Sequence, residues 1–404
     1  CQADAGGEHT LARTNSGAIL SAGACGLGWC RSLAMVPTLF GWRTVNIPEP
    51  ITTLHAAYYH NLAIGHSGKL YSWGCGTFVD GNNDGVIPAL GQDREDRGES
   101  PSLVHDVHAI AISGGAYHSI VLDNQHRLLT FGAGQLGQLG RSLEHSHSPS
   151  ATNDGAGLPV DPVPRPVEGD DNYTHEHVER VGSGFYNTLA MCRSGALYCA
   201  GENQNKQCGV MGGTNNIFKM SRVIEVKDKH VVASEGGYCH TLVLDQNGEV
   251  MTLGCGDEGQ RGDGVSEAMY EEMQGSSSRP VVSQVTLPCR AIGIAAGANH
   301  SVVLGENGEV FAFGSNEYGQ CGLTMSTSSD GKSNSEEDDD NDSSHVLAPV
   351  RVMLPADAGR AVSVSAGYAH TVVRDEHGAV FTFGQNENGQ LGLGCVIGIG
   401  VEAR

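Results

Sequence analysis

The residues of this chain with the clearest chemical potential are histidines that recur at nearly regular intervals. Each follows a step of small residues and begins a short apolar segment, as in GAYHSIV at Gly115–Val121. Seven positions share this pattern, with asparagine at one of them: His9, His60, His118, Asn187, His240, His300 and His370. Imidazole nitrogens bind metal ions and exchange protons. One histidine at an equivalent place in every repeat favours another role, and we predict buried side chains that bond the backbone of neighbouring strands.

Other motifs that could carry chemistry also belong to the repeat. Gly132–Gly137 and Gly254–Gly259 both match G-x-G-x-x-G, but a dinucleotide site needs a helix next and an acid about twenty residues further on. The pairs His145/His147 and His175/His177 have no cysteines at the spacing of a zinc site. No Ser/His/Asp, Cys/His or paired-carboxylate set stands out from the repeat. We therefore predict no metal, no cofactor and no covalent catalysis.

The elements that position the histidines read as short strands. An Asn-Gly or similar turn leads into a second apolar strand that ends in glycine, as in Asn307–Gly314 and His377–Gly384. Such turns between alternating apolar residues are typical of β-hairpins. With the outer segments, each unit holds roughly four strands, which is the content of one propeller blade. The spacing of 51 to 70 residues, repeated seven times, predicts an all-β, seven-bladed propeller in a single domain, 1–404.

Composition bounds the function and marks two inserts. The chain has 404 residues, a formal net charge of −22 and no apolar run long enough to cross a membrane. That charge argues against binding a phosphate backbone. We expect surface inserts at 141–172 and 324–345, and the second carries seven acids and one lysine. The twelve cysteines form no C-x-x-C pair, so we expect buried free thiols, including Cys75 and Cys255, and a reducing intracellular compartment.

Taken together, the repeat residues resemble a known family. The Gly-x-x-His-Thr strand, the Gly-x-Val-Phe-x-Phe-Gly strand at Gly308–Gly314 and the Gly-Gln-Leu-Gly corner at Gly137–Gly140 are similar to the regulator of chromosome condensation repeat. The resemblance covers the chain outside the two inserts and implies a seven-bladed propeller. Its members include exchange factors for the small GTPase Ran, ubiquitin-ligase adaptors, a plant ultraviolet-B photoreceptor and bacterial enzyme inhibitors. Fold alone therefore does not name the function.

The second repeat departs from the others after Trp73-Gly74. Its segment Cys75–Gly91, CGTFVDGNNDGVIPALG, resembles the wedge hairpin of the Ran exchange factors, with departures at Gly81 and Asp84. The matching positions are Phe78, Asp80, Asn82, Asn83, Gly85, Val86 and Ile87. The resemblance implies a guanine-nucleotide exchange factor for a Ran-like small GTPase, which does no covalent chemistry. The alternative is a non-catalytic scaffold or adaptor of the same fold that uses a propeller face without the wedge.

Elsewhere the chain departs from the exchange-factor pattern. Where those factors present polar residues to the GTPase, this chain has Tyr58, Tyr117 and Cys239. The insert 141–172 holds six acids and two arginines, so chromatin contact through it is not expected. With only three tryptophans, the chain cannot form the photoreceptor's chromophore cluster around Trp42. We expect a monomer in the nucleus or cytoplasm, with Cys395–Glu402 lying beside the N-terminal unit to close the ring.

Overall fold

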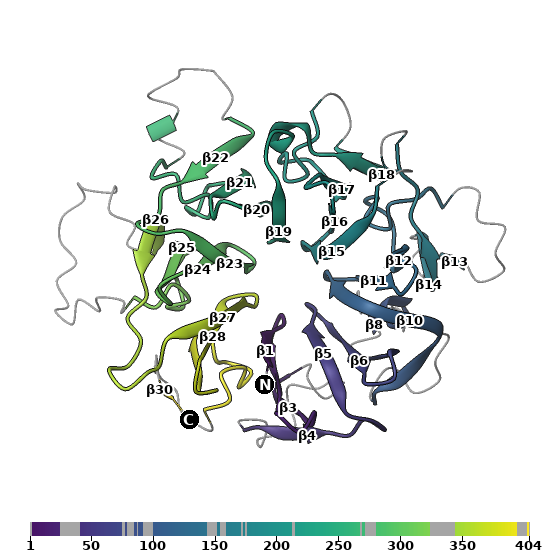
Figure 1. The fold of residues 1–404 in the computed structure, drawn as a ribbon, viewed down its shortest axis with the longest axis horizontal. Helices are drawn as coiled ribbons and strands as arrows, with labels where there is room; N and C mark the ends of the chain where they lie inside the picture. Colours follow the sequence, from purple (N-terminus) through teal and green to yellow (C-terminus); the bar gives the residue numbers. More distant parts are fainter. Residues whose placement is uncertain are drawn as a thin grey trace.

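The chain folds into a ring of antiparallel sheets (Figure 1). The computed structural model describes residues 2–24, 41–74, 77–78, 85–86, 88–91, 100–143, 152–153, 159–170, 173, 176–211, 215–266, 269–270, 280–323, 344–393 and 402–403. Strands dominate these residues, and the short 3-10 helices include η1 (Pro88–Leu90) and η3 (Ile224–Val226). The prediction of an all-β chain is confirmed. Among the described residues, no helix is long and apolar enough to cross a membrane.

Five of the sheets have four strands in chain order. The first contains β1 (Gln2–Ala5), β2 (His9–Arg13), β3 (Ile19–Gly23) and β4 (Arg43–Val45). The second contains β15 (Val178–Ser183), β16 (Asn187–Cys192), β17 (Leu197–Glu202) and β18 (Asn216–Arg222). The third contains β19 (Val231–Gly236), β20 (His240–Asp245), β21 (Val250–Gly254) and β22 (Val282–Val285). The fourth contains β23 (Ala291–Ala296), β24 (His300–Gly305), β25 (Val310–Ser315) and β26 (His345–Arg351). The fifth contains β27 (Ala361–Ala366), β28 (His370–Asp375), β29 (Val380–Gly384) and β30 (Glu402–Ala403).

The second and third repeats share one eight-stranded sheet. Its strands are β5 (Ile51–Ala56), β6 (His60–Gly65), β7 (Lys69–Gly74), β10 (Ser102–Gly114), β11 (His118–Asp123), β12 (Leu128–Ala133), β14 (Pro159–Pro166) and β13 (Thr152–Asn153). The long strand β10 joins the two halves. Its first part pairs with β7, at Ser102↔Ser72, and its second part pairs with β11, at Gly114↔Ser119. One strand is thus the outer strand of one repeat and the inner strand of the next.

The innermost strands surround the centre of the ring (Figure 1). They are β1, β5, β10, β15, β19, β23 and β27, and each contacts the next, with β27 contacting β1. Backbone hydrogen bonds also run from one repeat step to the next, for example from Gly7 N–H to Tyr58 C=O and from Tyr368 N–H to Gly7 C=O. The ring therefore closes through direct contact between the first and last sheets.

The register explains why the repeat needs glycine at the end of its third strand. In the second repeat, His60 pairs with Gly74, and every other repeat has the same pairing. Gly74 has a φ of 127°, and a Cβ there would lie 2.6 Å from the Cα of His60. Only glycine fits that backbone comfortably. The third strand of each repeat therefore ends beside the residues that come just before the repeat histidine.

The hydrophobic core lies between neighbouring sheets. Strands β6, β11 and β24 are buried along their whole length because other strands cover both of their faces. Trp73 and Phe313, near the ends of β7 and β25, are fully buried. The repeated apolar positions thus make a rigid frame, and the variable positions lie at its rims and centre.

The structure describes the predicted inserts and the chain end only in part. Pro159–Pro166, inside the insert expected at 141–172, forms strand β14. Arg141 is buried there and its Nη2 lies 2.9 Å from Oδ2 of Asp161. Residues 324–343 of the acidic insert and 394–401 lie outside the described residues. Glu402 pairs with Thr382, so β30 belongs to the last sheet. The rest of the segment predicted to lie beside the N-terminal unit, 395–401, is outside the described residues, so that prediction stays untested.

The expectation of free thiols is wrong for four cysteines. Cys199 is bonded to Cys208, and Cys239 is bonded to Cys255. Both pairs lie near the point where the third strand of a repeat ends and its glycine corner begins, and the fold brings the two sulfur atoms of each pair together there. Cys192 and Cys321 are buried free thiols, as expected, and Cys289 is half-buried. The cysteines therefore no longer indicate a reducing compartment.

A candidate partner-binding face and central channel

The repeat histidines form a belt that joins neighbouring repeats. All six are buried, with at most 1% of the side chain exposed. We call the seven positions that hold these histidines, or Asn187 in the fourth repeat, the lead residues of the repeats. In each histidine, ring Nε2 lies within hydrogen-bond distance of the residue that follows the lead residue of the next repeat. The pairs are His9–Asn61 at 2.6 Å, His60–Ser119 at 2.7 Å, His118–Thr188 at 3.1 Å, His240–Ser301 at 3.0 Å, His300–Thr371 at 3.0 Å and His370–Thr10 at 3.0 Å. The prediction of buried structural histidines is confirmed, and the Nε2 bonds join each histidine to a side chain of the next repeat where backbone groups were predicted.

The hydroxyl groups fix the direction of these bonds. The hydroxyl of Thr371 donates to the carbonyl of Gln320 at 2.7 Å, so His300 Nε2 must donate to that hydroxyl. Nδ1 of each belt histidine is buried without a hydrogen-bond partner. Burial lowers the pKa of these histidines to about 4 for His9, His118 and His240. It lowers the pKa of the other three, His60, His300 and His370, to about 3.

The low pKa values of these histidines do not favour a role in acid–base catalysis. A general acid or base works best when its pKa lies near the operating pH. No group of three His, Cys, Asp or Glu side chains in the described part of the chain is arranged to hold a metal ion. Asn187 takes the histidine's place in the fourth repeat, where its Nδ2 donates to the carbonyl of Glu202 at 2.5 Å. The belt therefore stabilises the ring.

Just before the belt, aromatic side chains from five repeats meet over the centre of the ring. We call this set the aromatic cap: Tyr58, Tyr59, Tyr117, Phe185, Tyr186, Tyr238 and Tyr368. The Tyr58 ring contacts Phe185 with a centroid distance of 4.3 Å and Tyr368 with one of 5.6 Å. These three residues belong to the second, fourth and seventh repeats, so the rings join across the channel.

The members of the aromatic cap differ in their exposure to solvent. Tyr238 is 46% exposed and Tyr368 is 40% exposed, whereas Tyr58 is half-buried. Burial raises the pKa of Tyr58, Tyr117 and Tyr186 further above neutrality, so these phenols keep their protons. Large aromatic side chains that are partly exposed and rigidly packed are typical anchors of protein interfaces. The cap is therefore a candidate contact surface.

The predicted partner residues divide on this face. Tyr58 and Tyr117 belong to the cap, and Cys239 is disulfide-bonded to Cys255 and half-buried. The sequence analysis did not single out the other cap members. Their signal was nevertheless present, because the steps AYYH, GFYN, GYCH and GYAH place aromatic residues one or two positions before the lead residue.

The segment predicted as a wedge has the backbone of a hairpin. Strand β8 (Thr77–Phe78) pairs with β9 (Gly85–Val86), with Thr77 opposite Val86 and Phe78 opposite Gly85. Asp80, Asn82, Asn83 and Ile87 lie outside the described residues. The chain enters the hairpin from Gly74, whose partner His60 directly follows Tyr58 and Tyr59. The strand that precedes the hairpin in the chain, β7, therefore ends next to the cap residues Tyr58 and Tyr59.

The return of this hairpin is anchored to two repeats. In η1, the carbonyl of Leu90 accepts a hydrogen bond from Ser72 at 2.6 Å. The carbonyl of Ala89 accepts one from Ser119 at 2.7 Å, and Ser119 is also the partner of His60. Ser119 thus connects η1, which follows the hairpin in the chain, to the belt.

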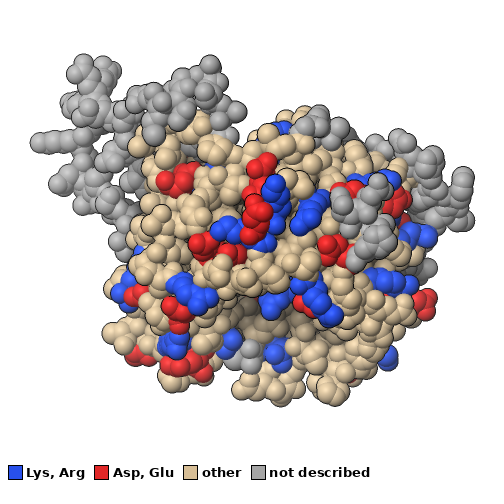
Figure 2. Space-filling model, turned by 45° about the horizontal axis from the view of Figure 1, so that its top comes forward, with Lys and Arg blue, Asp and Glu red and all other residues tan. Residues whose placement is uncertain are grey.

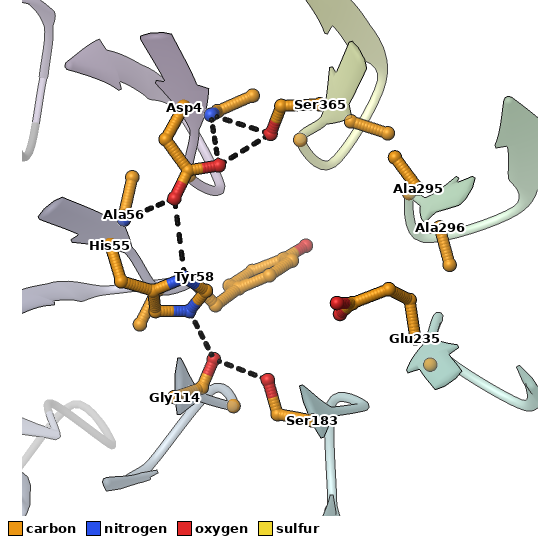
Figure 3. Close-up of a pocket in the computed structure, with 18 of the residues that line it drawn as sticks. Asp4, His55, Ala56, Tyr58, Gly114, Ser183, Glu235, Ala295, Ala296 and Ser365 are labelled. Carbon is orange, nitrogen blue, oxygen red and sulfur yellow. Dashed lines mark hydrogen bonds and ion pairs between the residues drawn. The ribbon is translucent and has the colours of Figure 1, made fainter. Parts of the chain in front are cut away.

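Beneath the cap lies a cavity of about 320 Å³ in the central channel (Figure 3). Asp4 lies on its wall and accepts hydrogen bonds from Ala56 N at 2.9 Å and from Ser365 Oγ. Nδ1 of His55 lies 3.2 Å from Oδ2 of Asp4. Burial opposes the charge on both groups, but each raises the stability of the other's charged form. The pKa of Asp4 is lowered and that of His55 is raised.

The outer surface carries mixed charge. On the face shown in Figure 2, Lys and Arg side chains are interspersed with Asp and Glu. Several pair directly, such as Arg193 with Glu179 at 2.5 Å and Arg351 with Glu309 at 2.9 Å. A surface of this kind does not favour a polyanion, which requires clustered basic residues.

Comparisons with known proteins agree with these features. The Regulator of chromosome condensation (RCC1) repeat matches residues 307–374, and a second description of that repeat matches residues 291–320 and 361–390. The mouse Regulator of chromosome condensation is 30% identical over 78% of this chain and 71% of its own length. The human protein of that name is 28% identical over 92% and 82%.

Other relatives have different names, and some are much longer than this chain. The human Probable E3 ubiquitin-protein ligase HERC6 is 27% identical over 69% of this chain, which spans 24% of that protein. The Arabidopsis thaliana Ultraviolet-B receptor UVR8 is 25% identical over 83% of this chain and 65% of its own length. The crystal structure of Prp20p from Saccharomyces cerevisiae has the same fold, with a TM-score of 0.69, 18% identity, and coverage of 96% of this chain and 85% of that chain. The chain belongs to the regulator of chromosome condensation family.

Proposed function

We propose that this chain is a seven-bladed β-propeller that acts as a guanine-nucleotide exchange factor for a Ran-like small GTPase. In this interpretation the eight-stranded sheet counts as two blades, since β10 serves both repeats. Relatives support the activity. The yeast Guanine nucleotide exchange factor SRM1 is 25% identical over 68% of this chain and 54% of its own length. Prp20p is described with binding properties to Gsp1p and histones.

The observation that carries the proposal is the β8–β9 hairpin, which follows in the chain the end of β7 next to the aromatic cap. The corresponding position in other repeats holds a tight glycine corner, such as Gly314–Gly319. An exchange factor binds the nucleotide-free GTPase more tightly than the loaded one, and by reciprocity it lowers the affinity for nucleotide by the same factor. A hairpin anchored to the histidine belt can compete for the phosphate site of the GTPase without changing its own conformation.

The cap supplies the surrounding contact in this proposal. Tyr238 and Tyr368 present exposed rings, and Tyr58 and Phe185 support them from beneath. Aromatic anchors bind through buried area with little loss of side-chain entropy. Where other exchange factors offer polar residues, this chain would therefore rely on apolar contact, and its partner should present an apolar patch. With such a partner, the protein would work as a monomer in the nucleus or the cytoplasm.

The experiment is a release assay with the wild-type chain. A panel of small GTPases, including Ran, is loaded with a fluorescent GDP analogue and mixed with excess unlabelled GDP. We expect accelerated release from at least one Ran-like member, by about a hundredfold or more, which corresponds to about 2.8 kcal/mol at about 1.4 kcal/mol for each factor of ten. Unchanged release across the whole panel would refute the exchange activity.

A second candidate is a scaffold or adaptor that binds through the cap without promoting exchange. The replacement of polar residues by Tyr58 and Tyr117 favours it, and relatives such as HERC6 and UVR8 show that the family is not confined to exchange factors. Binding of a GTPase or another protein that depends on the cap, with no change in nucleotide release, would support this function over the first.

A further inference from the structure

At one position of the channel wall, the residue type changes from repeat to repeat, whereas the belt position almost always holds histidine. Five residues before each lead residue, the inner strands place one side chain at the same level of the channel. These positions are Asp4, His55, Ser113, Gly182, Glu235, Ala295 and Ser365. We call this set the channel ring. Its members range from acid to base to glycine, although their backbones are equivalent. The ring is therefore not required by the fold to be polar.

On one side, the ring satisfies itself. Asp4 receives Ala56 N at 2.9 Å, Ala5 N at 3.1 Å, Ser365 Oγ and the His55 ring. Nε2 of His55 lies 3.4 Å from the carbonyl oxygen of Gly114. On this side, each charged group has a partner of the opposite sign or a hydrogen bond. This side of the channel ring therefore needs no ligand to balance its charges.

On the other side, Glu235 has no such partner. Its neighbours at the same level, Gly182 and Ala295, have no side-chain donor. Among the described residues, no hydrogen bond or ion pair reaches its carboxylate. Figure 3 shows the carboxylate facing the cavity, across from the Asp4–His55 pair. Burial raises the pKa of Glu235 to about 8, the His55 charge opposes this rise and the Asp4 charge adds to it. A half-buried carboxylate without a partner is destabilising, and a bound cation would remove that penalty.

The cavity has the size and lining for a small cation. Its volume of about 320 Å³ lies at the low end of ligand pockets, and small residues such as Ala56, Ala295 and Ala296 line the walls. The Tyr58 side chain extends into the same space, with its hydroxyl end toward Glu235 (Figure 3). A cation close to an aromatic face gains electrostatic stabilisation, and aromatic cages recognise ammonium groups in this way.

The geometry also indicates the route of entry. The cap rings contact one another over one end of the channel, at 4.3 Å between Tyr58 and Phe185. The cavity extends the other way, to Gln2, Thr53 and Ser363, which lie two residues earlier on the inner strands than the channel ring. A ligand would enter from the end opposite the cap, away from the hairpin.

We propose that the central channel binds an organic ammonium ion, with Glu235 as its counter-ion and Tyr58 as an aromatic wall. The ion is either a free small molecule or the ammonium side chain of a protein that docks on the face opposite the cap. This site opens to the other face, and Tyr58 is the one residue that its proposed ligand contacts share with the aromatic cap, so it does not depend on the exchange activity.

Choline is the probe for the free ion, and its neutral isostere dimethylbutanol is the matched control. Isothermal calorimetry or protein NMR should show that choline binds with a Kd of about 1 mM or lower. The alcohol should bind at least about tenfold more weakly. A peptide containing trimethyllysine tests the second source. Tighter binding of the peptide than of choline would assign the ligand to a protein side chain. If neither cation binds, the cavity does not take an ammonium ion and the proposal is wrong. If choline and the alcohol bind equally, the positive charge is not recognised, which also overturns the proposal.

Variants locate the site. Glu235→Gln should weaken choline binding by about tenfold or more, and Tyr58→Leu by a smaller factor. Glu306→Gln, at an exposed turn of the sixth repeat, should leave binding unchanged. Glu235→Asp keeps the charge and should keep part of the affinity, which separates loss of charge from misfolding. Equal choline affinity of Glu235→Gln and wild type would overturn the assignment.

A pH series adds an independent readout. Choline keeps its charge, so its affinity should fall by about tenfold per pH unit below pH 8 as Glu235 takes up a proton. His55 and Asp4 face the same cavity. Protonation of His55 would weaken cation binding in the same direction, whereas Asp4, with its lowered pKa, stays ionised. An affinity independent of pH between 6.5 and 8.5 would contradict a role for Glu235.

Discussion

The histidine belt and the channel ring lie only five residues apart on the same chain segments, yet their chemistry differs. Six of the seven belt positions hold a buried neutral histidine that bonds the next repeat. The channel ring holds acids, a histidine, serines, alanine and glycine at positions with equivalent backbone. The difference teaches that a repeat protein can separate its tasks by position. Repeated residues hold the ring together, and positions that vary are free to bind partners.

Acid should break the belt first and with the largest effect. The belt histidines have an ordinary pKa of 6.5 when unfolded and about 3 or 4 when folded, so their contribution is present above pH 6.5 and is lost as pH falls toward the folded values. At pH 5.5 each histidine should lower the free energy of unfolding by about 1.4 kcal/mol, or about 8 kcal/mol for six. Chemical denaturation at pH 7.5 and 5.5 measures this.

Glu235 works against this trend. Its raised pKa means that the folded state holds a proton that the unfolded state releases between pH 4.5 and 8, so this group stabilises the fold as pH falls. One glutamate contributes about 1.4 kcal/mol per pH unit over that range, which does not offset six histidines. Equal stability at pH 7.5 and 5.5 would show that the belt histidines are not held neutral.

Single belt residues should have a smaller but clear effect. His300→Ala removes the donor to Thr371 and leaves a cavity at a fully buried position. We expect the free energy of unfolding to fall by roughly 1–3 kcal/mol, measured by urea denaturation. Asn187→Ala, at the one position without a histidine, removes bonds within a single repeat only, which makes it the matched comparison. If His300→Ala has no effect, the belt does not bear on stability.

Much of this division could be predicted from the sequence. The period of the histidine step, the Asn-Gly turns and the corner glycines predicted the β-propeller, because each repeat copies the same local chemistry. The burial of His9 and its equivalents followed from their equivalence. Their partners were not predictable, since a hydroxyl such as that of Thr10 meets His370 only after the ring closes, across 360 residues.

The site was predictable only in part. The hairpin was visible because Cys75–Gly91 breaks the repeat, and the pairing of Phe78 with Gly85 agrees with it. The aromatic cap and the channel ring were not found, because each repeat contributes one or two residues and only the closed ring brings them together. The disulfides were missed for a similar reason. Cys239 and Cys255 are 16 residues apart and meet through the strand register, not through a local motif.

The cap should matter for binding and hardly for stability. Tyr238→Ala with Tyr368→Ala removes two rings that are 46% and 40% exposed, so we expect a change in the free energy of unfolding of about 1 kcal/mol or less. Partner affinity should fall by about tenfold or more, measured by surface binding to the GTPase found in the release assay. Ile292→Ala, 56% exposed and eight residues before His300, is the control at the other end of the channel. Equal losses in both variants would remove the cap from the interface.

The most direct test of the exchange mechanism is nucleotide release by a hairpin variant. Phe78→Ala, Asn82→Ala and Asn83→Ala are combined, and GDP release from the cognate GTPase is timed against wild type at matched concentration. Glu317→Ala, an exposed change at the corresponding corner of the sixth repeat, is the control, because neighbouring Asn316 is buried and bonds Cys321 N–H. The account predicts that the triple variant keeps the wild-type melting temperature and loses most of the acceleration, while Glu317→Ala keeps it. Release by the triple variant at the wild-type rate would contradict the account.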